Sequence, residues 1–244
     1  MRYQFVDCGW ELTRPERGRE LYLSAHIPGA SVLDVEGELA DLSVKDAGRH
    51  PLPSADRFAA SASRAGIGAG VFVIGYDQGT GGGAARLWWL LRHFGHDQAA
   101  VLEGGLAAWS GPFGRGEETI EPALFEPRPR IGDTIDADEL AARLDEDGLM
   151  IVDARAPERY RGDVEPIDPV AGRIPGAVNW PYSAARASVP DEILAAGEIV
   201  VYCGSGITSC VNLHALALAE RADAKLYSGS WSDWSNRGLP IERG

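Results

Sequence analysis

The fold of the second half of the chain is decided by the stretch Val200-Val201-Tyr202-Cys203-Gly204-Ser205-Gly206-Ile207-Thr208-Ser209. The β-branched run at 199–201 predicts a buried strand that ends at Cys203. The Ala- and Leu-rich sequence that follows the stretch predicts a helix continuing to about Arg221. Gly204 and Gly206 let the backbone turn tightly where a side chain would clash, so the stretch indicates strand, loop and helix.

A loop of this kind can aim several backbone N–H groups at one point, and the following helix adds the positive end of its dipole. Cys203 lies at that point, where a thiol is held as the reactive thiolate. Most free cysteines are inert packing residues, but the strand–Cys–Gly-x-Gly–helix context favours a functional one. Cysteine phosphatases need an arginine six positions after the cysteine to hold phosphate, and here that position is Ser209. The alternative chemistry for this loop is sulfur transfer through a persulfide.

Length and composition limit the classes of protein. A chain of 244 residues can form one large or two ordinary domains. Its net charge of −13 makes nucleic acid an unsuitable partner, because phosphate binding needs a basic patch. Three cysteines suit a reducing compartment better than a disulfide framework. Without an apolar signal segment or a run near the roughly 20 residues that span a bilayer, we expect a soluble cytoplasmic protein with no membrane partner.

The two halves of the chain echo each other in the same order, which favours duplication of one domain. The matching pairs of segments are 5–8 with 151–154, 26–30 with 173–177, 73–77 with 199–203, and 104–109 with 229–234. Each half predicts strand, loop, strand, helix, strand, helix, the order of a parallel α/β sheet.

A segment rich in glycine, proline and charge separates the halves, and we expect an extended strap there. The predicted boundaries are a first domain over 1–114, a linker over 115–133 and a second domain over 134–244. Asp136, with Glu139 three residues later, predicts a capped helix start just after the linker.

The chain resembles tandem-domain sulfurtransferases of the rhodanese superfamily, most closely the mercaptopyruvate branch. The resemblance rests on Cys-Gly-Ser-Gly-Ile-Thr at 203–208, Asp-Ala-Arg at 153–155, Glu-Arg-Tyr-Arg-Gly at 158–162, Ile-Pro-Gly-Ala in both halves, and Gly-Ser-Trp-Ser-Asp-Trp at 229–234. It implies two rhodanese-like α/β domains, each a parallel sheet flanked by helices. In that family the second domain carries the cysteine. Here the first-half counterpart of Cys203 is Asp77, so the first domain is expected to be catalytically silent.

We expect Cys203 to be the nucleophile, with a pocket that stabilises its persulfide. The backbone N–H groups of the loop, including those of Gly204, Gly206 and Ile207, would form that pocket. The hydroxyls of Ser205 and Thr208 could bind sulfur or substrate, although Thr208 could equally serve as a helix cap.

Arginines are expected to hold the anionic donor, since a guanidinium can bind a carboxylate through two hydrogen bonds. Arg159 and Arg155 follow the strand at 150–153 and match family positions that face the donor, with a surface salt bridge as the alternative for each. The mercaptopyruvate branch often has a further arginine after this segment, but residues 164–169 contain none. Arg173, in place of the usual histidine, is a candidate for the missing cation.

His50 resembles a first-domain histidine that reaches the second domain's cleft in some family members, and Glu36 matches the acid that pairs with it. Such a pair beside a Ser–Cys loop would help to move a proton. The alternative is a loop histidine without a role.

The sequence thus predicts transfer of sulfur from 3-mercaptopyruvate, a small anionic donor, to a thiol, cyanide or thioredoxin-like acceptor, with no metal or organic cofactor implied. The neutral residues Gly204 and Ser205 favour this donor, because the thiosulfate branch places cations in the loop. Thiosulfate remains the alternative donor, and a non-catalytic sulfur-binding or regulatory module the alternative class.

Overall fold

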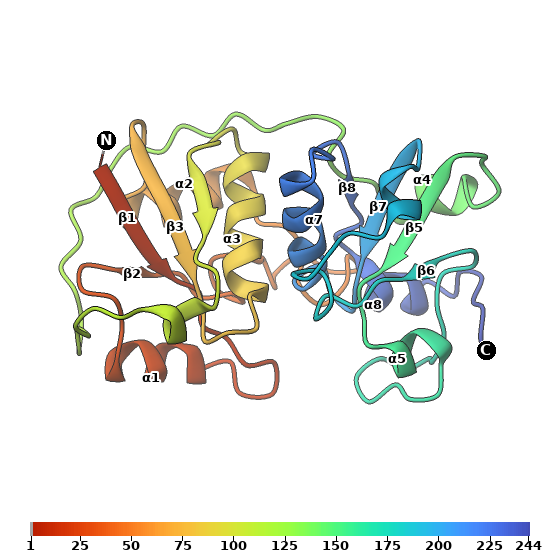
Figure 1. Ribbon diagram of the computed structural model, residues 1–244, viewed down its shortest axis with the longest axis horizontal. Helices are drawn as coiled ribbons and strands as arrows, with labels where there is room; N and C mark the ends of the chain where they lie inside the picture. The colour runs from red at the N-terminus through yellow and green to blue at the C-terminus, as the bar shows by residue number, and fades with distance from the viewer. Residues whose placement is uncertain (1) are drawn as a thin grey trace. The chain divides into compact units, whose positions relative to one another are not determined.

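The computed structural model describes residues 2–244, and the chain divides into two compact units. Unit 1 comprises the chain up to Asp41 together with residues 52–130, and unit 2 comprises residues 42–51 and 131–244. Each unit contains a four-stranded sheet whose strands all pair in parallel, flanked by helices (Figure 1). The predicted fold class, two α/β units with parallel sheets, is confirmed.

Unit 1 has the strand order β2-β1-β3-β4. Its strands are β1 (Arg2–Asp7), β2 (Ser31–Val32), β3 (Val71–Tyr76) and β4 (Ala99–Val101), and its helices are α1 (Arg17–Ser24), α2 (Ala55–Arg64), α3 (Gly82–His93) and the 3-10 turn η1 (Gly105–Ala108).

Unit 2 repeats that order as β6-β5-β7-β8. Its strands are β5 (Leu149–Asp153), β6 (Val178–Asn179), β7 (Glu198–Tyr202) and β8 (Lys225–Leu226), and its helices are α4 (Ala137–Ala142), α5 (Pro157–Arg161), α6 (Asp191–Leu194), α7 (Ser209–Leu218) and α8 (Ser230–Asn236). β7 lies between β5 and β8, and its residues 199–202 are completely buried. A continuous apolar run suits a central parallel strand, because both of its faces are covered.

Two helix ends compare directly with the sequence prediction. Asp136 caps α4 as expected, since its carboxylate accepts the Glu139 N–H at 2.8 Å. α7 ends at Leu218, three residues before the predicted end at Arg221. Glu220 has a φ of 65°, in the left-handed region that closes a helix, so the chain turns there.

Residues 115–130 run along unit 1 as an extended strap, the light-green chain in Figure 1. Its backbone N–H groups bond to carbonyls of other unit 1 elements, with Gly116 bonding to Leu23, Ala123 to Ser63 and Arg128 to Phe94. The strap is therefore a fixed part of unit 1, which agrees with an extended, proline-rich segment.

A short segment from the first half of the sequence, residues 42–51, belongs to unit 2. Gly48 fixes its position, because it has a φ of +83° and a methyl group on its Cα would lie 2.4 Å from the Gly229 carbonyl oxygen. The next residue, Arg49, donates its N–H to the Ser232 hydroxyl at 3.0 Å. The segment is thus anchored at the N-terminus of α8.

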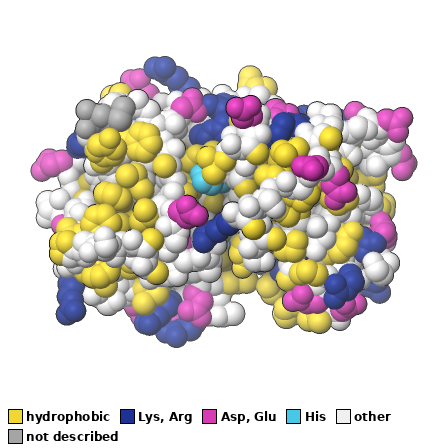
Figure 2. Space-filling model, viewed as in Figure 1, with side chains coloured by type: hydrophobic (Ala, Val, Ile, Leu, Met, Phe, Trp, Pro, Cys, Tyr) yellow, Lys and Arg dark blue, Asp and Glu magenta, His cyan; other side chains and the backbone are white. Residues whose placement is uncertain are grey.

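Acidic and basic side chains are interspersed over the face of the molecule shown in Figure 2. Within residues 2–244, no helix combines the length and apolar character needed to cross a membrane.

Candidate active site

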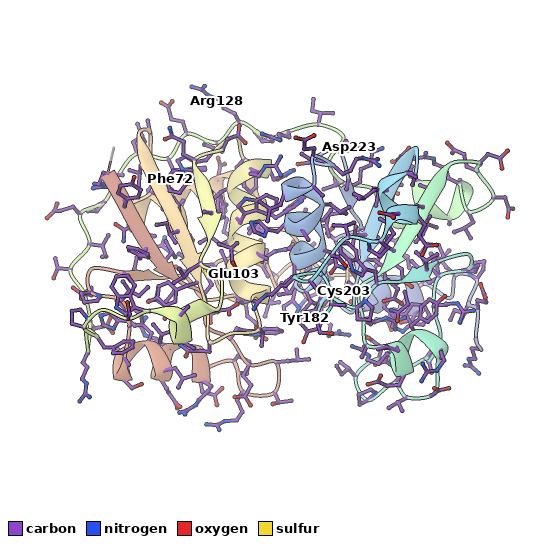
Figure 3. The ribbon with its side chains drawn as sticks, in the orientation of Figure 1. Phe72, Glu103, Arg128, Tyr182, Cys203 and Asp223 are labelled. Carbon is purple, nitrogen blue, oxygen red and sulfur yellow. The ribbon has the colours of Figure 1, made fainter. Side chains whose placement is uncertain are left out.

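Cys203 lies directly after β7, at the start of the loop that leads into α7 (Figure 3). Its side chain is 1% exposed. Its backbone is fixed from two sides, because its N–H donates to the Ser230 hydroxyl at 3.1 Å and its carbonyl accepts the Trp231 N–H at 3.0 Å. The rigid strand end and the N-terminus of α8 therefore hold the thiol in one place.

The loop surrounds the Cys203 sulfur with hydrogen-bond donors. The Gly206 N–H donates to Sγ at 3.1 Å. Burial is the largest influence on the thiol and opposes its ionisation, but the hydroxyls of Ser209 and Thr208 and the backbone N–H groups of Ser205 and Ser209 outweigh it. The pKa of Cys203 is lowered as a result, which favours the nucleophilic thiolate.

Two glycines give the loop its shape. Gly206 has a φ of +79°, and a methyl group there would lie 2.5 Å from the Ser228 carbonyl oxygen. At Gly204 a methyl group would lie 2.9 Å from Nη2 of Arg49 and 3.4 Å from Nη1 of Arg159. The first glycine allows the turn, and the second allows two guanidinium groups to approach the loop backbone.

The other loop residues differ in what their side chains do. Ile207 is buried, and its carbonyl accepts the Cys210 N–H at 3.1 Å, so it contributes packing and backbone. Thr208 precedes α7 without capping it through its side chain. The effect of its hydroxyl on the Cys203 pKa places Thr208 at the sulfur, in line with the first of its two expected roles.

His50 lies beside the loop, as its sequence context predicts. Its Nδ1 is 2.8 Å from the Ser205 hydroxyl oxygen, and both side chains are buried. Because residues 42–51 form part of unit 2, this contact is internal to that unit. A histidine bonded to a hydroxyl beside a thiol can pass a proton along that line.

Glu36 belongs to unit 1, where its carboxylate accepts the Trp10 indole N–H at 3.4 Å. The pairing of Glu36 with His50 stays a prediction.

Arg159, on α5, lies near the loop and is paired with two carboxylates. Its Nη2 bonds to Glu165 at 2.7 Å and to Asp168 at 3.2 Å, and its Nε bonds to Glu165 at 3.1 Å. Nη1 makes no hydrogen bond with residues 2–244, and of the two terminal nitrogens it would lie nearer to a methyl group added at Gly204, at 3.4 Å against 3.6 Å for Nη2. Arg159 thus has one nitrogen available for a ligand.

Arg155 is 2% exposed and is committed to the protein itself. It forms a two-point pair with Asp153, with Nε and Nη2 at 3.0 and 2.6 Å from its carboxylate oxygens. Nη2 also donates to the Gly172 carbonyl at 2.7 Å, and the guanidinium lies 4.6 Å over the Trp231 ring. These contacts support a positioning role for Arg155, because they leave it little capacity to bind a donor.

Arg173 makes its contacts with residues outside the cysteine loop. It bonds to the Glu242 carboxylate and to the Gly244 carbonyl, and it lies over the Tyr160 ring. Glu242 also accepts the Gly176 N–H at 3.0 Å. The expected substrate-binding role of Arg173 has no support from this arrangement.

The equivalent position in unit 1 makes the same kind of contact. His26, the first-half counterpart of Arg173, bonds to Glu118 at 3.1 Å, and Glu118 accepts the Gly29 N–H at 2.9 Å. Both units therefore use a cation or histidine before Ile-Pro-Gly to hold a glutamate from a later segment.

Sequence reasoning missed Arg49, which meets the site through long-range contacts. Its Nη1 bonds to Asp168, and its Nη2 would lie 2.9 Å from a methyl group added at Gly204. The only local signal was a cation next to His50, and the partner Asp168 lies 119 residues further along the chain.

The corresponding loop in unit 1 is closed by its own carboxylate. Asp77 accepts the N–H groups of Gly79 and Gly81 at 2.8 and 2.9 Å through Oδ1, and that of Ala84 at 3.4 Å through Oδ2. An acceptor side chain that fills the N–H pocket leaves no place for a sulfur anion.

The sequence matches the Rhodanese-like domain family twice, over residues 3–112 and 136–237. A Pseudomonas aeruginosa protein with the provisional name 3-mercaptopyruvate sulfurtransferase is 42% identical over 94% of this chain and 88% of its own length. A Mycobacterium tuberculosis (strain H37Rv) protein, provisionally named thiosulfate sulfurtransferase SseB, is 39% identical over 98% of this chain and 90% of its own length.

A solved structure supports the same assignment. The crystal structure of SseA from Escherichia coli, whose title concerns the rhodanese fold of 3-mercaptopyruvate sulfotransferases, aligns with a TM-score of 0.79 and 30% identity. The alignment covers 94% of this chain and 93% of that one. The two family matches, the relatives and the shared fold establish that the chain belongs to the rhodanese-like family.

Proposed function

We propose that the protein is a sulfurtransferase that takes sulfur from 3-mercaptopyruvate onto Cys203 and passes it to a nucleophilic acceptor. The observation that carries the proposal is the buried Cys203 thiol, with its lowered pKa, facing the Gly206 N–H. Names of relatives that specify sulfurtransferases support it.

In the first step the Cys203 thiolate attacks the donor sulfur. The new S–S bond forms as the donor C–S bond breaks, the electron pair goes to carbon as an enolate, and the donor's thiol proton ends on that carbon. The products are a Cys203 persulfide and pyruvate. An acceptor thiolate then attacks the outer sulfur, the S–S bond breaks, and Cys203 returns as thiolate while the acceptor leaves as its persulfide.

The residues around Cys203 have distinct tasks in this scheme. Loop N–H groups stabilise the sulfur anion, as a preformed anion pocket does in other acyl- and group-transfer sites. Ser205 and His50, 2.8 Å apart, move the thiol proton towards the enolate. Arg159 binds the donor carboxylate through its available Nη1.

Thiosulfate is the alternative donor, and one relative carries that name. It bears two negative charges, whereas Gly204 and Ser205, the residues that follow Cys203, are neutral. The arginines approach Gly204 from outside the loop, an arrangement that suits a single carboxylate held at a distance from the reacting sulfur.

Two measurements test the proposal. Intact mass after incubation with each donor should show a gain of one sulfur atom on the wild type and none on Cys203→Ser. The ratio kcat/KM should favour 3-mercaptopyruvate over thiosulfate with a common cyanide or thiol acceptor. No sulfur gain from either donor would point to a sulfur-binding or regulatory module, and a preference for thiosulfate would assign the protein to the other branch.

The acceptor class in the proposal is a thiol, cyanide or a thioredoxin-like protein, and the location is the cytoplasm. All three cysteines are free and buried, which suits a reducing compartment. Fractionation of the native host, with immunodetection of the protein, tests the location.

A further inference from the structure

We propose that Ser209, the first residue of α7, is a persulfide-binding residue whose hydroxyl donates a hydrogen bond to the outer sulfur carried on Cys203. This inference rests on the proposed function, because it concerns the intermediate of that reaction. It assigns a task to a side chain that follows the Cys-Gly-Ser-Gly-Ile-Thr stretch at 203–208.

Ser209 lies where the loop enters α7, and its side chain is directed at the sulfur. It stands six positions after Cys203, the place at which cysteine phosphatases need an arginine to hold phosphate. Burial has the largest effect on the Cys203 thiol and raises its pKa. Among the groups that lower this pKa, the Ser209 hydroxyl has the largest effect, and the Ser209 N–H adds to it. One residue therefore presents two donors to the sulfur, at a helix end that favours negative charge.

The Ser209 hydroxyl is buried without a completed hydrogen bond. The residue is 0% exposed, and its Oγ has no hydrogen-bond partner within residues 2–244. A buried hydroxyl in this condition costs free energy that an alanine would avoid. The hydroxyl thus lies close enough to influence the inner sulfur but completes no bond to it. It remains available to an acceptor atom that arrives beside that sulfur.

Helix capping does not account for this serine. A capping serine accepts a backbone N–H two or three residues later through its side-chain oxygen. The Ser209 Oγ accepts no such N–H, and Thr208, which precedes it, makes no side-chain cap either. The first turn of α7 therefore leaves the Ser209 hydroxyl to the cysteine pocket.

The corresponding position in unit 1 has no hydroxyl. Gly83 stands six positions after Asp77, as Ser209 does after Cys203. A methyl group on Gly83 would lie 2.0 Å from the Cys8 carbonyl oxygen, so the backbone there leaves no room for a side chain. The unit whose pocket is filled by a carboxylate thus lacks this donor, and the unit with the thiol has it.

A persulfide supplies the missing acceptor. Its S–S bond places the outer sulfur about 2 Å from Sγ, and the negative charge of the thiolate passes to that outer atom. The inner sulfur keeps the Gly206 N–H, which lies 3.1 Å from Sγ. A donor that completes its bond only in the persulfide stabilises the loaded protein more than the empty one. The consequence is a shift of the sulfur-loading equilibrium towards Cys203.

The test measures this equilibrium against glutathione persulfide. The Cys203 thiolate attacks the outer sulfur of that compound, the new S–S bond forms as the old one breaks, and the electron pair leaves with glutathione as its thiolate. Intact mass at fixed ratios of the two glutathione species gives the equilibrium constant. Ser209→Ala should lower this constant by about 10-fold, the effect of one hydrogen bond to a charged acceptor.

Ser235→Ala is the matched control. Ser235 is also buried, and its Oγ also has no partner within residues 2–244, but it lies on α8 rather than at the cysteine loop. Its loading equilibrium should equal that of the wild type. All measurements are made above the thiol pKa of each variant, as fixed by the pH dependence of iodoacetamide alkylation, so that thiol ionisation does not contribute.

An equilibrium constant that is unchanged or higher in Ser209→Ala would overturn the inference, because the hydroxyl would then serve the thiolate at least as well as the persulfide. An equal fall in Ser235→Ala would also overturn it, since the loss of any buried hydroxyl would then suffice. The proposed function fails in a different way. Wild-type Cys203 that accepts sulfur from glutathione persulfide but not from 3-mercaptopyruvate would refute the donor, while the comparison of Ser209 with Ser235 would still stand.

Discussion

Cys8 directly follows β1 in unit 1 and Cys203 directly follows β7 in unit 2, and both thiols are buried, but their surroundings differ. Burial raises the pKa of Cys8 well above that of an ordinary thiol, and the charges of Asp7 and Asp77 add to the effect. At Cys203, hydroxyl and N–H donors lower the pKa despite burial. Of these two thiols, therefore, only that of Cys203 has surroundings that favour the nucleophilic thiolate.

Alkylation should reveal this difference. With iodoacetamide at mildly acidic pH, peptide mass mapping should find Cys203 modified before Cys8, because the thiolate is the reacting form. The rate at Cys203 should level off at a lower pH than the rate for a free thiol. In the denatured protein the two should react alike. Equal rates in the native protein would contradict the pocket described around Cys203.

Asp7 and Asp153 make a second contrast. Asp153 pairs with Arg155, whereas Asp7 has Gly9 at the arginine's place and its Oδ2 is buried without a hydrogen-bond partner in residues 2–244. Burial, partly opposed by the Gly9 N–H and by Tyr76, raises the pKa of Asp7 from 3.8 to about 6. Because this pKa is higher in the folded state than in the unfolded state, the neutral Asp7 carboxyl stabilises the fold at a pH below about 3.8. That stabilisation is lost as the pH rises to about 6 and the carboxyl ionises.

Asp7→Asn should therefore gain stability relative to the wild type between pH 4 and 6, by about 3 kcal/mol at most from the size of the shift. Asp153→Asn is the matched control. It leaves buried Arg155 without its main partner and should lose about 3–5 kcal/mol at neutral pH. Denaturant unfolding at a series of pH values measures both. A pH-independent difference for Asp7→Asn would argue against ionisation of Asp7 as the cause.

At the scale of elements, the segment 42–51 depends on one glycine. Gly48→Ala would force a left-handed residue and place a methyl group against Gly229. Gly148→Ala has the same backbone cost, with a φ of +86°, but no atom lies within 4 Å of the added methyl group. Both variants should lose about 1–2 kcal/mol of unfolding free energy, because a residue with a Cβ atom is strained in the left-handed conformation.

Only Gly48→Ala should reduce kcat/KM for sulfur transfer, by about 10-fold or more, because it displaces Arg49 and His50 together. Steady-state kinetics of the two variants, compared at matched folded fractions, measures this. Equal kcat/KM values would show that the segment tolerates the displacement.

Local patterns explain which elements the sequence predicts well. The strand, the loop and the start of the helix around Cys203 follow from residues that adjoin each other, as does the Asp136 cap. Arg173 illustrates the opposite case. Its partners Glu242 and Gly244 lie about 70 residues away, and nothing near Arg173 indicates them. Arg49 was missed for the same reason, since Asp168 and Gly204 become its neighbours only in the folded chain.

At the scale of the whole molecule, unit 2 is not a continuous stretch of sequence. A fragment of residues 131–244 contains Cys203 and Arg159 but lacks Arg49 and His50. It should form little persulfide from 3-mercaptopyruvate, as judged by intact mass. Fusion of residues 42–51 to this fragment through a flexible linker should restore part of the loading, because it returns both side chains to the unit. Full loading of the fragment alone would show that the segment is dispensable.

The crossing of residues 48–50 into unit 2 also bears on how the chain acquires its structure. The contacts His50–Ser205 and Arg49–Ser232 join residues 155 and 183 positions apart, among the longest loops that this chain can close. Contacts between residues so far apart in sequence form late in folding, because closing the long loop between them costs conformational entropy before the contact contributes any stability. During synthesis the segment 42–51 emerges long before its partners, and it must wait until α8 has left the ribosome. The thiol pocket is built mainly from adjoining residues and can form early, whereas the contacts of Arg49 and His50 with unit 2 form last, so a newly made chain completes the surroundings of Cys203 only at the end of folding.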